Sequence, residues 1–401
     1  MNFIFISPNF PHTYWQFCDR LHKNGVNVLG IGDAPYDILE NNLKLVLKEY
    51  YKVNSLENYD EVYNAVKFFE NKYGKIDYIE SNNEYWLEQD ARIRTDFDIK
   101  SGIQFNEIKN WKQKSLMKRI YKEADIKSAA QDFITTKENA LNFIETNGGY
   151  PVIIKPDIGV GSSDTWKIEN EKELDVFFQN KLKTTYVIEQ FIEGDVCSYD
   201  AIVNSNSEPV FESMTVWPPS IADIVNKGYD LSYYVVPIMP DNLRAIGRKT
   251  LKAFCVKNRF VHLEFFRLKK SYPNIGNVGD FAALEVNMRP AGGYTPDMIN
   301  FAHSVDTYQI WADVLSSSVK SNFGENKHYF CVYASRKNEH KYLHTHNEVL
   351  NKYGKNIVMC EKMPELMWAT MGCQMYTAKF ENKKETDEFI NFVHERENNA
   401  N

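Results

Sequence analysis

The stretch Phe-Ala-Ala-Leu-Glu-Val-Asn-Met-Arg-Pro-Ala-Gly-Gly-Tyr-Thr-Pro-Asp, residues 281–297, carries the pattern that decides the fold. Its first six residues are mostly apolar and predict a short buried strand. Glu285, Asn287 and Arg289 follow at alternate positions, so they project from one face of an extended chain. These three groups are costly to bury without a partner. A Mg²⁺ ion that shares phosphate oxygens would provide one, with Arg289 holding a phosphate or carboxylate.

A second strand is expected just upstream, at residues 260–266, with Glu264 on the same face as His262. The intervening residues 269–280 contain Pro273, Gly276 and Gly279, which is typical of a hairpin loop. An antiparallel hairpin would bring Glu264 and Glu285 together, and their carboxylates would repel unless cations bridge them. The alternative is a solvated hairpin face with a surface ion pair.

Composition limits the class of protein. A chain of 401 residues is expected to form more than one domain, and 43% hydrophobic residues support a sizeable core. A net charge of −7 argues against nucleic acid as the main partner. Six scattered cysteines without a CxxC motif predict reduced thiols and a cytoplasmic protein. The apolar start at residues 1–6 lacks a basic region and predicts a strand instead of a signal peptide, and we expect no membrane span.

The first 105 residues alternate between strand and helix patterns. Strands are expected at 2–7, 26–31 and 76–79, with helices near 15–22 and 59–73 and a C-cap at Gly74. This alternation predicts a doubly wound parallel sheet. Without G-x-G-x-x-G after the first strand, a dinucleotide site is not expected. Residues 82–84, Asn-Asn-Glu, follow the third strand and form either a ligand contact at the sheet edge or a polar loop.

The middle of the chain predicts a small β-rich module at residues 130–190. A helix over 111–124 carries Lys112, Lys114 and Lys118, for which a solvated charged face is the default interpretation. A strand at 130–134 and a helix at 136–147 follow, and then a strand at 150–156 that ends with Lys155. A loop of glycines and serines comes next and can bring backbone N–H groups to an anion, although it is not a P-loop. A strand at 186–190 closes a module shaped to cover a nucleotide.

The remainder is expected to form one helix at 302–316, a linker at 316–327 and a small α+β domain at 328–395. The turn at 290–296 is either a tight turn or a carboxylate contact through the backbone of Gly292 and Gly293. His340, His344 and His346 are interpreted as polar loop residues in preference to a metal site, because no cysteine or acidic ligand has suitable spacing.

Four blocks of sequence together resemble the ATP-grasp superfamily over roughly residues 110–315. They are Lys114, the strand and loop 152–163, the hinge 187–194, and Glu264 with the E-x-N-x-R run at 285–289. The resemblance implies a mixed α/β and α+β fold in several parts. These are an N-terminal βαβ domain at 1–110, a lid subdomain with its leading helix at 111–192, a central antiparallel-sheet domain at 193–320 and the C-terminal domain at 328–395.

The resemblance also implies roles for individual residues. Catalytic roles would fall to Arg289, Lys155 and Asn287, and metal binding to Glu264, Glu285 and Asn287, with one or two Mg²⁺ ions or Mn²⁺ in their place. ATP would be held by Lys114, Lys155, Gly159, Gly161, Ser162, Ser163, Glu189, Gln190, Phe191 and Ile192, and by Glu193 or Asp195 at the ribose.

The activity implied is an ATP-dependent ligase that activates a carboxylate, expected to be an amino acid, as an acyl phosphate and transfers it to an amine. Cations must screen two anions from each other in this chemistry, and a lid must exclude water. Two alternatives stand beside it. One is a biotin carboxylase-like or carbamoyl-phosphate-type enzyme acting on bicarbonate, although the run that usually follows E-x-N-x-R in biotin carboxylases is missing. The other is an ATP-binding regulatory protein without turnover. Partners would be small molecules, and family members are often homodimers.

Overall fold

The N-terminal part folds around a four-stranded parallel sheet. The computed structural model describes residues 1–159, 164–181, 183–218, 228–318 and 327–397. Strand order in this sheet is β3-β2-β1-β4, so the chain moves outward from β1 to β3 and then returns to the other side of β1. The strands are β1 (Asn2–Ile6), β2 (Asn27–Gly32), β3 (Glu49–Lys52) and β4 (Tyr78–Glu80).

Helices cover both faces of this sheet, which confirms the doubly wound prediction. Phe5 and Phe17 pack with Trp311 on one face, whereas Ile4 packs with Val62 from α3 on the other. The third predicted strand begins later, at Tyr78, and the sequence analysis missed the short elements α2 and β3. The helices are α1 (Trp15–Lys23), α2 (Asn41–Val46), α3 (Tyr59–Tyr73) and α4 (Leu87–Asp96), with short 3₁₀ turns at His12–Tyr14 and Tyr36–Ile38.

A four-stranded antiparallel sheet in the order β5-β8-β6-β7 forms the predicted β-rich module. Thr136 caps α7 by accepting a hydrogen bond from the backbone N–H of Asn139, and Gly148 and Gly149 follow the helix with positive φ. The elements are β5 (Gln131–Ile134), α7 (Lys137–Thr146), β6 (Val152–Pro156), β7 (Trp166–Ile168), α8 (Glu171–Asn180) and β8 (Tyr186–Gln190).

The single helix predicted for residues 111–124 is wrong. The chain forms α5 (Lys109–Lys112) and α6 (Lys114–Glu123), separated by Gln113 in an extended conformation with ψ of 118°. This break lets Lys114 begin a new helix, where its backbone N–H donates to the carbonyl of Asp157 at 2.9 Å. The start of α6 is therefore fastened to the end of β6.

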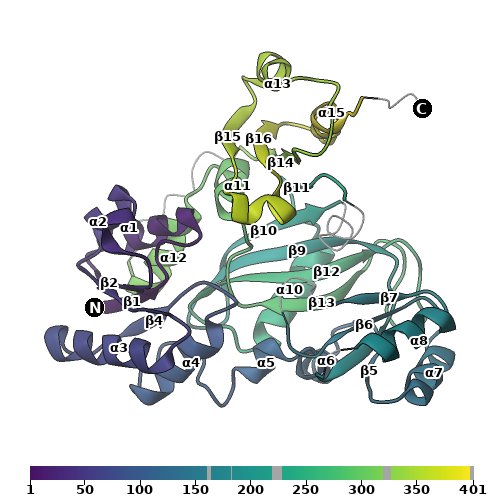
Figure 1. Ribbon diagram of the computed structural model, residues 1–401, viewed down its shortest axis with the longest axis horizontal. Helices are drawn as coiled ribbons and strands as arrows, with labels where there is room; N and C mark the ends of the chain where they lie inside the picture. Colours follow the sequence, from purple (N-terminus) through teal and green to yellow (C-terminus); the bar gives the residue numbers. More distant parts are fainter. Residues whose placement is uncertain (160–163, 182, 219–227, 319–326, 398–401) are drawn as a thin grey trace.

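An eight-stranded antiparallel sheet occupies the centre of the molecule, in the order β13-β12-β9-β10-β11-β14-β16-β15. Figure 1 shows it between the N-terminal sheet and the small antiparallel sheet, with the C-terminal helices beyond its other end. The strands are β9 (Gly194–Val203), β10 (Pro209–Trp217), β11 (Ser232–Val235), β12 (Arg259–Leu268), β13 (Phe281–Asn287), β14 (Phe330–Arg336), β15 (Ile357–Lys362) and β16 (Gln374–Phe380), with α10 (Asp241–Ala253) packed on one face.

The helix predicted for residues 302–316 is also wrong in its extent. Two helices, α11 (Thr295–His303) and α12 (Thr307–Ser316), meet at Ser304, which has a φ of 54°. The second helix begins directly after Asp306, whose side chain accepts a hydrogen bond from the N–H of Gln309 and caps α12. The predicted linker lies mostly outside the described residues.

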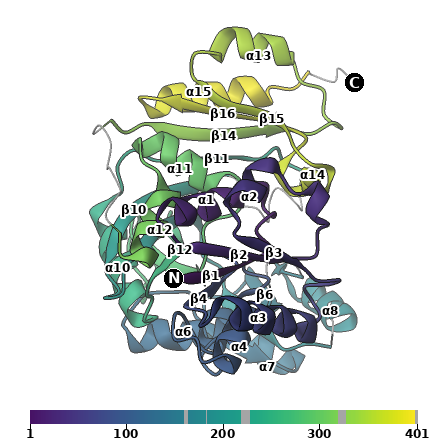
Figure 2. The ribbon, with the colours of Figure 1, turned by 90° about the vertical axis from the view of Figure 1, so that its left-hand side faces the viewer.

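The C-terminal strands have an apolar cluster of their own, yet they continue the central sheet through the pairing of β11 with β14. Figure 2 shows β14, β15 and β16 stacked beyond β11, with α13 and α15 at the top of the view. The helices are α13 (His346–Tyr353), α14 (Trp368–Met371) and α15 (Lys383–His394), with a 3₁₀ turn at Glu365–Met367.

The three C-terminal histidines have separate hydrogen-bond partners. His340 bonds to Asp230, His344 to Glu395 and His346 to the hydroxyl of Tyr376. The described part of the chain contains no group of three or more His, Cys, Asp or Glu side chains placed to hold a metal ion. Nor does any helix in the described ranges have the length and apolar character needed to cross a bilayer.

Candidate active site

The β12–β13 hairpin places the two predicted carboxylates opposite each other. Glu264 pairs directly with Glu285 in antiparallel register, and His262 pairs with Asn287. Paired residues share a face of the sheet, so all four side chains lie on one side. The Asn287 Nδ2 donates to Glu264 Oε1 at 3.1 Å. The hairpin prediction is confirmed.

Cationic groups from several elements surround these carboxylates. Lys114 Nζ lies 3.4 Å from Glu285 Oε1, and His262 Nε2 lies 3.4 Å from Glu264 Oε1. Burial raises the pKa of Glu264, but His262, Arg289 and Lys155 lower it by a larger amount. The pKa of Glu264 is therefore below its usual value. The interpretation of this face as a solvated surface pair is therefore wrong, because the buried Lys114 of α6 and Lys155 of β6 supply counter-charges from outside the hairpin.

Asp200 on β9 orients the ring of His262. Asp200 Oδ1 lies 2.7 Å from His262 Nδ1, and its second oxygen accepts hydrogen bonds from Ser198 at 2.7 Å and Thr215 at 2.9 Å. Burial lowers the pKa of His262, but Asp200 and Glu264 raise it to about 9. His262 was predicted to share the face of Glu264 but not to belong to the site, although the alternation alone could have included it.

A second cluster centres on Glu189 at the end of β8. Its carboxylate lies 2.7 Å from Lys155 Nζ and 3.3 Å from Lys118 Nζ, and accepts a hydrogen bond from Gln131 at 2.8 Å. Burial raises the pKa of Glu189, but Lys118 and Lys155 hold it at about 2. The negative charges of Glu285 and Glu264 also raise the pKa of Lys155, so the two clusters form one electrostatic neighbourhood.

The interpretation of Lys114 and Lys118 as a solvated helix face is wrong. Lys114 is 8% exposed, and burial lowers the pKa of Lys118 despite the opposing effect of Glu189. The two lysines are four residues apart and therefore lie on one face of α6, which points toward the site. This spacing was the signal that could have identified Lys118 from the sequence.

The glycine-rich loop is described only at its start. Gly159 accepts a hydrogen bond from Lys114 Nζ through its carbonyl at 3.1 Å. Gly161, Ser162 and Ser163 lie outside the described residues. The contact nevertheless joins the beginning of this loop to the cation that faces Glu285.

The predicted adenine hinge connects β8 to β9. Gln190 donates its backbone N–H to the carbonyl of Ala130 at 3.0 Å, and Lys167 Nζ lies 5.0 Å from the ring centroid of Phe191. Ile192 is buried against Leu268. The hinge is thus anchored to neighbouring strands on both sides.

The structure separates the two candidates for a ribose contact. Glu193 is exposed, and its backbone N–H donates to the hydroxyl of Tyr272 at 2.7 Å. Asp195 pairs in register with Arg267, whereas Glu264 pairs with Ser198, so Asp195 projects from the face opposite Glu264. Its carboxylate lies 2.5 Å from Lys269 Nζ and lines a cavity of about 430 Å³ on that opposite face.

Arg289 lies just after β13 and faces the N-terminal sheet. Its Nη1 donates to the carbonyl of Pro290 at 2.8 Å, and its Nε lies 3.7 Å from Glu84 Oε2. The turn that follows is stabilised by Thr295, whose hydroxyl donates to the carbonyl of Gly292 at 2.8 Å. These contacts favour the tight-turn interpretation of residues 290–296.

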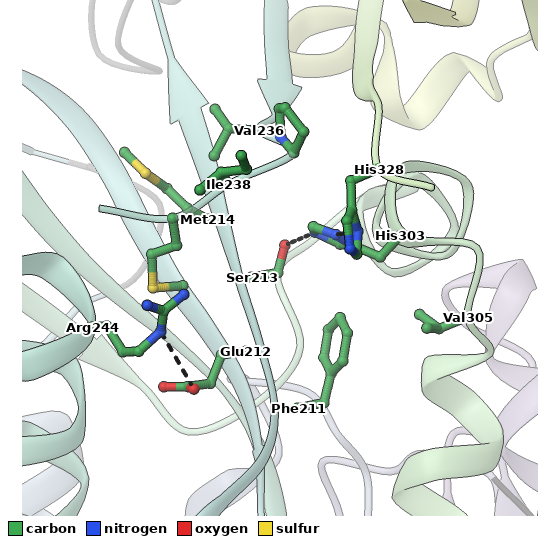
Figure 3. A pocket seen from close by; sticks show the side chains of 12 residues that line it. Phe211, Glu212, Ser213, Met214, Val236, Ile238, Arg244, His303, Val305 and His328 are labelled. Atoms are coloured by element: carbon green, nitrogen blue, oxygen red, sulfur yellow. Dashed lines mark hydrogen bonds and ion pairs between the residues drawn. The ribbon is translucent and has the colours of Figure 1, made fainter. Parts of the chain in front are cut away.

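A cavity of about 320 Å³ lies elsewhere, beside β10 and α11 (Figure 3). Ser213 Oγ is 2.9 Å from His303 Nε2, and His303 Nδ1 is 3.1 Å from His328 Nδ1. Glu212 and Arg244 form an ion pair at its other side. Among the described residues, none of the side chains predicted for the site lines this cavity, so the predicted chemistry does not depend on it.

The oxygen donors of Glu264, Glu285 and Asn287 suit Mg²⁺. Two carboxylates and an amide are too few for an all-protein cage, but Mg²⁺ usually keeps waters and shares phosphate oxygens. The nearby lysines and Arg289 suit anionic phosphates. This donor set therefore fits a Mg²⁺-bound polyphosphate.

Comparison with protein families identifies the class. Residues 148–296 match the family model described as the ATP-grasp domain. This segment includes Lys155, the hinge, Glu264 and the E-x-N-x-R run. The chain therefore carries an ATP-grasp domain, which confirms the resemblance drawn from its sequence.

Solved structures extend the similarity to nearly the whole chain. L-amino acid ligase from Bacillus licheniformis is 14% identical with a TM-score of 0.72, covering 98% of this chain and 96% of its own. N5-carboxyaminoimidazole ribonucleotide synthetase from Thermotoga maritima is 14% identical with a TM-score of 0.66, covering 97% and 96%. Biotin carboxylase from Campylobacter jejuni is 16% identical with a TM-score of 0.63, covering 98% and 90%. The predicted fold is confirmed.

Proposed function

We propose that this protein is an ATP-dependent ligase that forms C–N bonds. A substrate carboxylate oxygen attacks the γ-phosphorus of ATP, the bond to the bridging oxygen breaks, and ADP leaves. An amine then attacks the acyl carbon of the resulting acyl phosphate, inorganic phosphate leaves, and the amine loses a proton. The products are an amide, ADP and phosphate.

One observation carries this proposal: Lys155, Glu264, Glu285 and Asn287 meet in a single neighbourhood. The two carboxylates are register partners, and their charges act on Lys155 from across the boundary between two sheets. An ATP-binding protein without turnover has no need of paired carboxylates, an amide and Arg289 beside its phosphate-binding lysines. Neighbours named as ligases and carboxylases share the fold and add support.

The nucleotide is assigned to the side of the small antiparallel sheet on which Lys155 and Glu189 lie near Glu285. Lys114 and Lys155 bind its phosphates, and the loop that begins at Gly159 covers them. When Lys155 binds the phosphates, it gives up its contact with Glu189. Lys118 remains beside Glu189 and keeps this carboxylate charged. The hinge residues Gln190 to Ile192 contact the adenine.

We assign the ribose contact to Glu193. Asp195 projects from the face opposite Glu264, and its carboxylate is paired with Lys269. To contact a nucleotide beside Lys155, it would have to break this ion pair and move to the other face of the sheet. Glu193 precedes β9 and is free to turn toward the hinge, since it is exposed.

Glu264, Glu285 and Asn287 hold one or two Mg²⁺ ions, for which Mn²⁺ is an alternative. When bound, Mg²⁺ screens the repulsion between the phosphates and the incoming carboxylate. Arg289 binds the reacting carboxylate and stabilises the charge that develops at the acyl group. Asp200 keeps His262 oriented against Glu264.

The test is ADP and phosphate release from Mg·ATP across a pool of amino acids, dipeptides and small carboxylates, with Glu285→Gln as the control. We expect release that depends on one class of carboxylate and is lost in Glu285→Gln. Hydroxylamine should trap the acyl phosphate as a hydroxamate.

Other results would redirect the assignment. Release that depends on bicarbonate alone would favour the carboxylase-type alternative. Mg·ATP binding without release for any acid would favour a regulatory protein, and failure to bind Mg·ATP would contradict the whole proposal.

We further propose small-molecule substrates, a homodimer and a cytoplasmic location. All six cysteines are free thiols, which agrees with a reducing compartment. Light scattering of the purified chain tests the dimer.

A further inference from the structure

The carboxyl ends of β1 and β4 form the place where strand order reverses in the N-terminal sheet. The chain runs from β1 to β2 and β3 on one side and then to β4 on the other. In open parallel sheets, loops at such a reversal separate and leave room for a ligand. β1 and β4 pair in parallel and lie side by side in this sheet (Figure 2).

Polar side chains in the loops after these two strands contain buried atoms without hydrogen-bond partners. Within the described chain, Glu84 Oε2, Asn82 Nδ2 and Asn9 Oδ1 are buried and accept or donate no hydrogen bond. Most buried polar groups in folded proteins are paired. Three exceptions in two loops at the same sheet edge indicate partners supplied from outside the chain.

Glu84 is the strongest of these exceptions because it is charged. Its side chain is 13% exposed, and the Arg289 Nε at 3.7 Å is too far for a hydrogen bond. Burial raises its pKa, which Arg289 and Lys112 lower and Glu285 raises further. Three cationic side chains attract this carboxylate and Glu285 repels it, but none of them donates a hydrogen bond to Oε2, so the atom can accept one from a ligand.

The surrounding loops are fixed to the residues that follow β13. Tyr14 donates through its hydroxyl to the carbonyl of Asn82 at 2.8 Å, and Gln16 Nε2 donates to Asp297 Oδ1 at 3.0 Å. The rings of His12 and Tyr294 meet edge to face at 5.3 Å. Glu84 and Arg289 are therefore held close together by the structure around them.

We propose that Glu84 binds the α-ammonium group of the carboxylate substrate, so that the acyl donor is an amino acid with a free α-amino group. This inference rests on the proposed function, in which Arg289 binds the reacting carboxylate. An α-amino acid carries its ammonium and carboxylate on one carbon, which matches opposite charges only 3.7 Å apart on the protein. A fatty acid or an N-acylated amino acid would leave Glu84 Oε2 buried without a hydrogen-bond donor, and a distant ω-amine would not reach it.

The first measurement uses the unmodified chain and does not depend on a variant. ADP release is compared for each active amino acid, for the des-amino acid with the same side chain and for the N-acetyl amino acid. We expect kcat/KM to fall by roughly 100-fold or more without the free ammonium, as for removal of one partner of a buried charge pair.

The second measurement uses Glu84→Gln, which keeps the shape and removes the charge, and Glu88→Gln as the matched control. Glu88 is exposed on α4, four residues further along. In Glu84→Gln we expect the KM for the amino acid to rise at least about tenfold, the KM for ATP to stay constant, and discrimination against the des-amino acid to disappear. Glu88→Gln should retain the values of the unmodified chain.

The outcomes separate the two proposals. Turnover that is equally fast with des-amino and N-acetyl acids would overturn the role of Glu84 and leave the ligase intact. An unchanged preference for the free ammonium in Glu84→Gln would also overturn it. Absence of carboxylate-dependent ADP release would instead contradict the proposed function itself.

Discussion

Two buried histidines, His262 and His303, have opposite charge states because their neighbours differ. Asp200 and Glu264 raise the pKa of His262 to about 9 against the effect of burial, so this ring is protonated at neutral pH. Burial lowers the pKa of His303 to about 4, and His328 lowers it as well, so this ring is neutral. A carboxylate neighbour decides the difference, because desolvation acts in the same direction on both rings.

His303 should make the protein less stable in mild acid. Its pKa is about 4 in the folded chain and 6.5 when unperturbed, so between these values the unfolded chain binds more protons. Stability contributed by the neutral ring is complete above pH 6.5 and is lost as the pH falls toward 4, by about 3 kcal/mol in total. Denaturant unfolding between pH 7.5 and 4.5 measures this loss.

The control for this prediction is His303→Gln, which keeps a polar group beside Ser213 but cannot take up a proton in this range. We expect it to flatten the pH dependence of the unfolding free energy. An identical slope in both proteins would assign the acid sensitivity to other groups.

At the scale of elements, α10 lies so close to β9 that only glycine fits at one contact. A Cβ atom on Gly247 would meet the ring of Tyr199 at 2.4 Å. Tyr199 cannot easily move, since it is buried and its hydroxyl donates to Glu212 at 2.7 Å. Glycine at position 247 therefore allows the helix to pack closely on the sheet, although glycine has a low helical propensity.

Gly247→Ala should consequently destabilise the protein, although alanine favours helices by about 1 kcal/mol. Overpacking against Tyr199 is expected to cost about 1–3 kcal/mol and to outweigh that gain. Thermal unfolding measures the difference, with the exposed Lys252→Ala on the same helix as the control. A higher unfolding temperature for Gly247→Ala would show that the contact relaxes without cost.

Element positions followed from local sequence where the apolar period was strong. The hairpin at Glu264 and Glu285, the helix from Tyr59 to Tyr73 and the helix that begins after Thr136 were all predictable from alternation and spacing. The break at Gln113 was not, since a contact distant in sequence decides it, and the break at Ser304 was missed although Asp306 is a local N-cap signal. Gln113 precedes a backbone bond from Lys114 to Asp157, which no helical pattern reveals.

The same division applies to the candidate site. Residue types in a recognisable order revealed Lys114, Lys155 and the E-x-N-x-R run. Lys118 could have been added from its spacing to Lys114, whereas Asp200 acts through His262 on another strand and became visible only once the strands were placed. Glu84 was predicted either as a ligand contact or as a polar loop residue. The sequence did not decide between these, because its neighbour Arg289 follows a strand of a different sheet.

At the scale of the whole molecule, one buried carboxylate connects the N-terminal sheet to the central sheet. Glu80 at the end of β4 lies 3.0 Å from Arg94 Nη2 and 2.6 Å from Arg259 Nη2 on β12. Arg259 also donates through Nε to the carbonyl of Met288 at 2.8 Å, directly before Arg289. Both guanidinium groups are almost fully buried, so the connection depends on the charge of Glu80.

Glu80→Gln should therefore destabilise the protein by about 3–5 kcal/mol, because it removes the one carboxylate that contacts both buried guanidinium groups. Arg259→Met should cost less, since Arg94 still pairs with Glu80. Denaturant unfolding with hydrogen exchange in β1 to β4 measures both variants, and the N-terminal sheet should lose protection first. Equal losses for the two variants would contradict this ranking.

The continuous central sheet has a consequence for dividing the protein. Every residue of β11 pairs with β14, from Ser232 with Ala334 to Val235 with Cys331. A chain truncated at residue 318 would keep the residues assigned to catalysis but would leave this strand with a row of unsatisfied backbone groups flanked by Tyr233 and Tyr234. Such an edge is a template for pairing with another chain. We therefore expect a chain truncated at residue 318 to associate through β11, and the C-terminal strands to be needed for a chain that stays monodisperse.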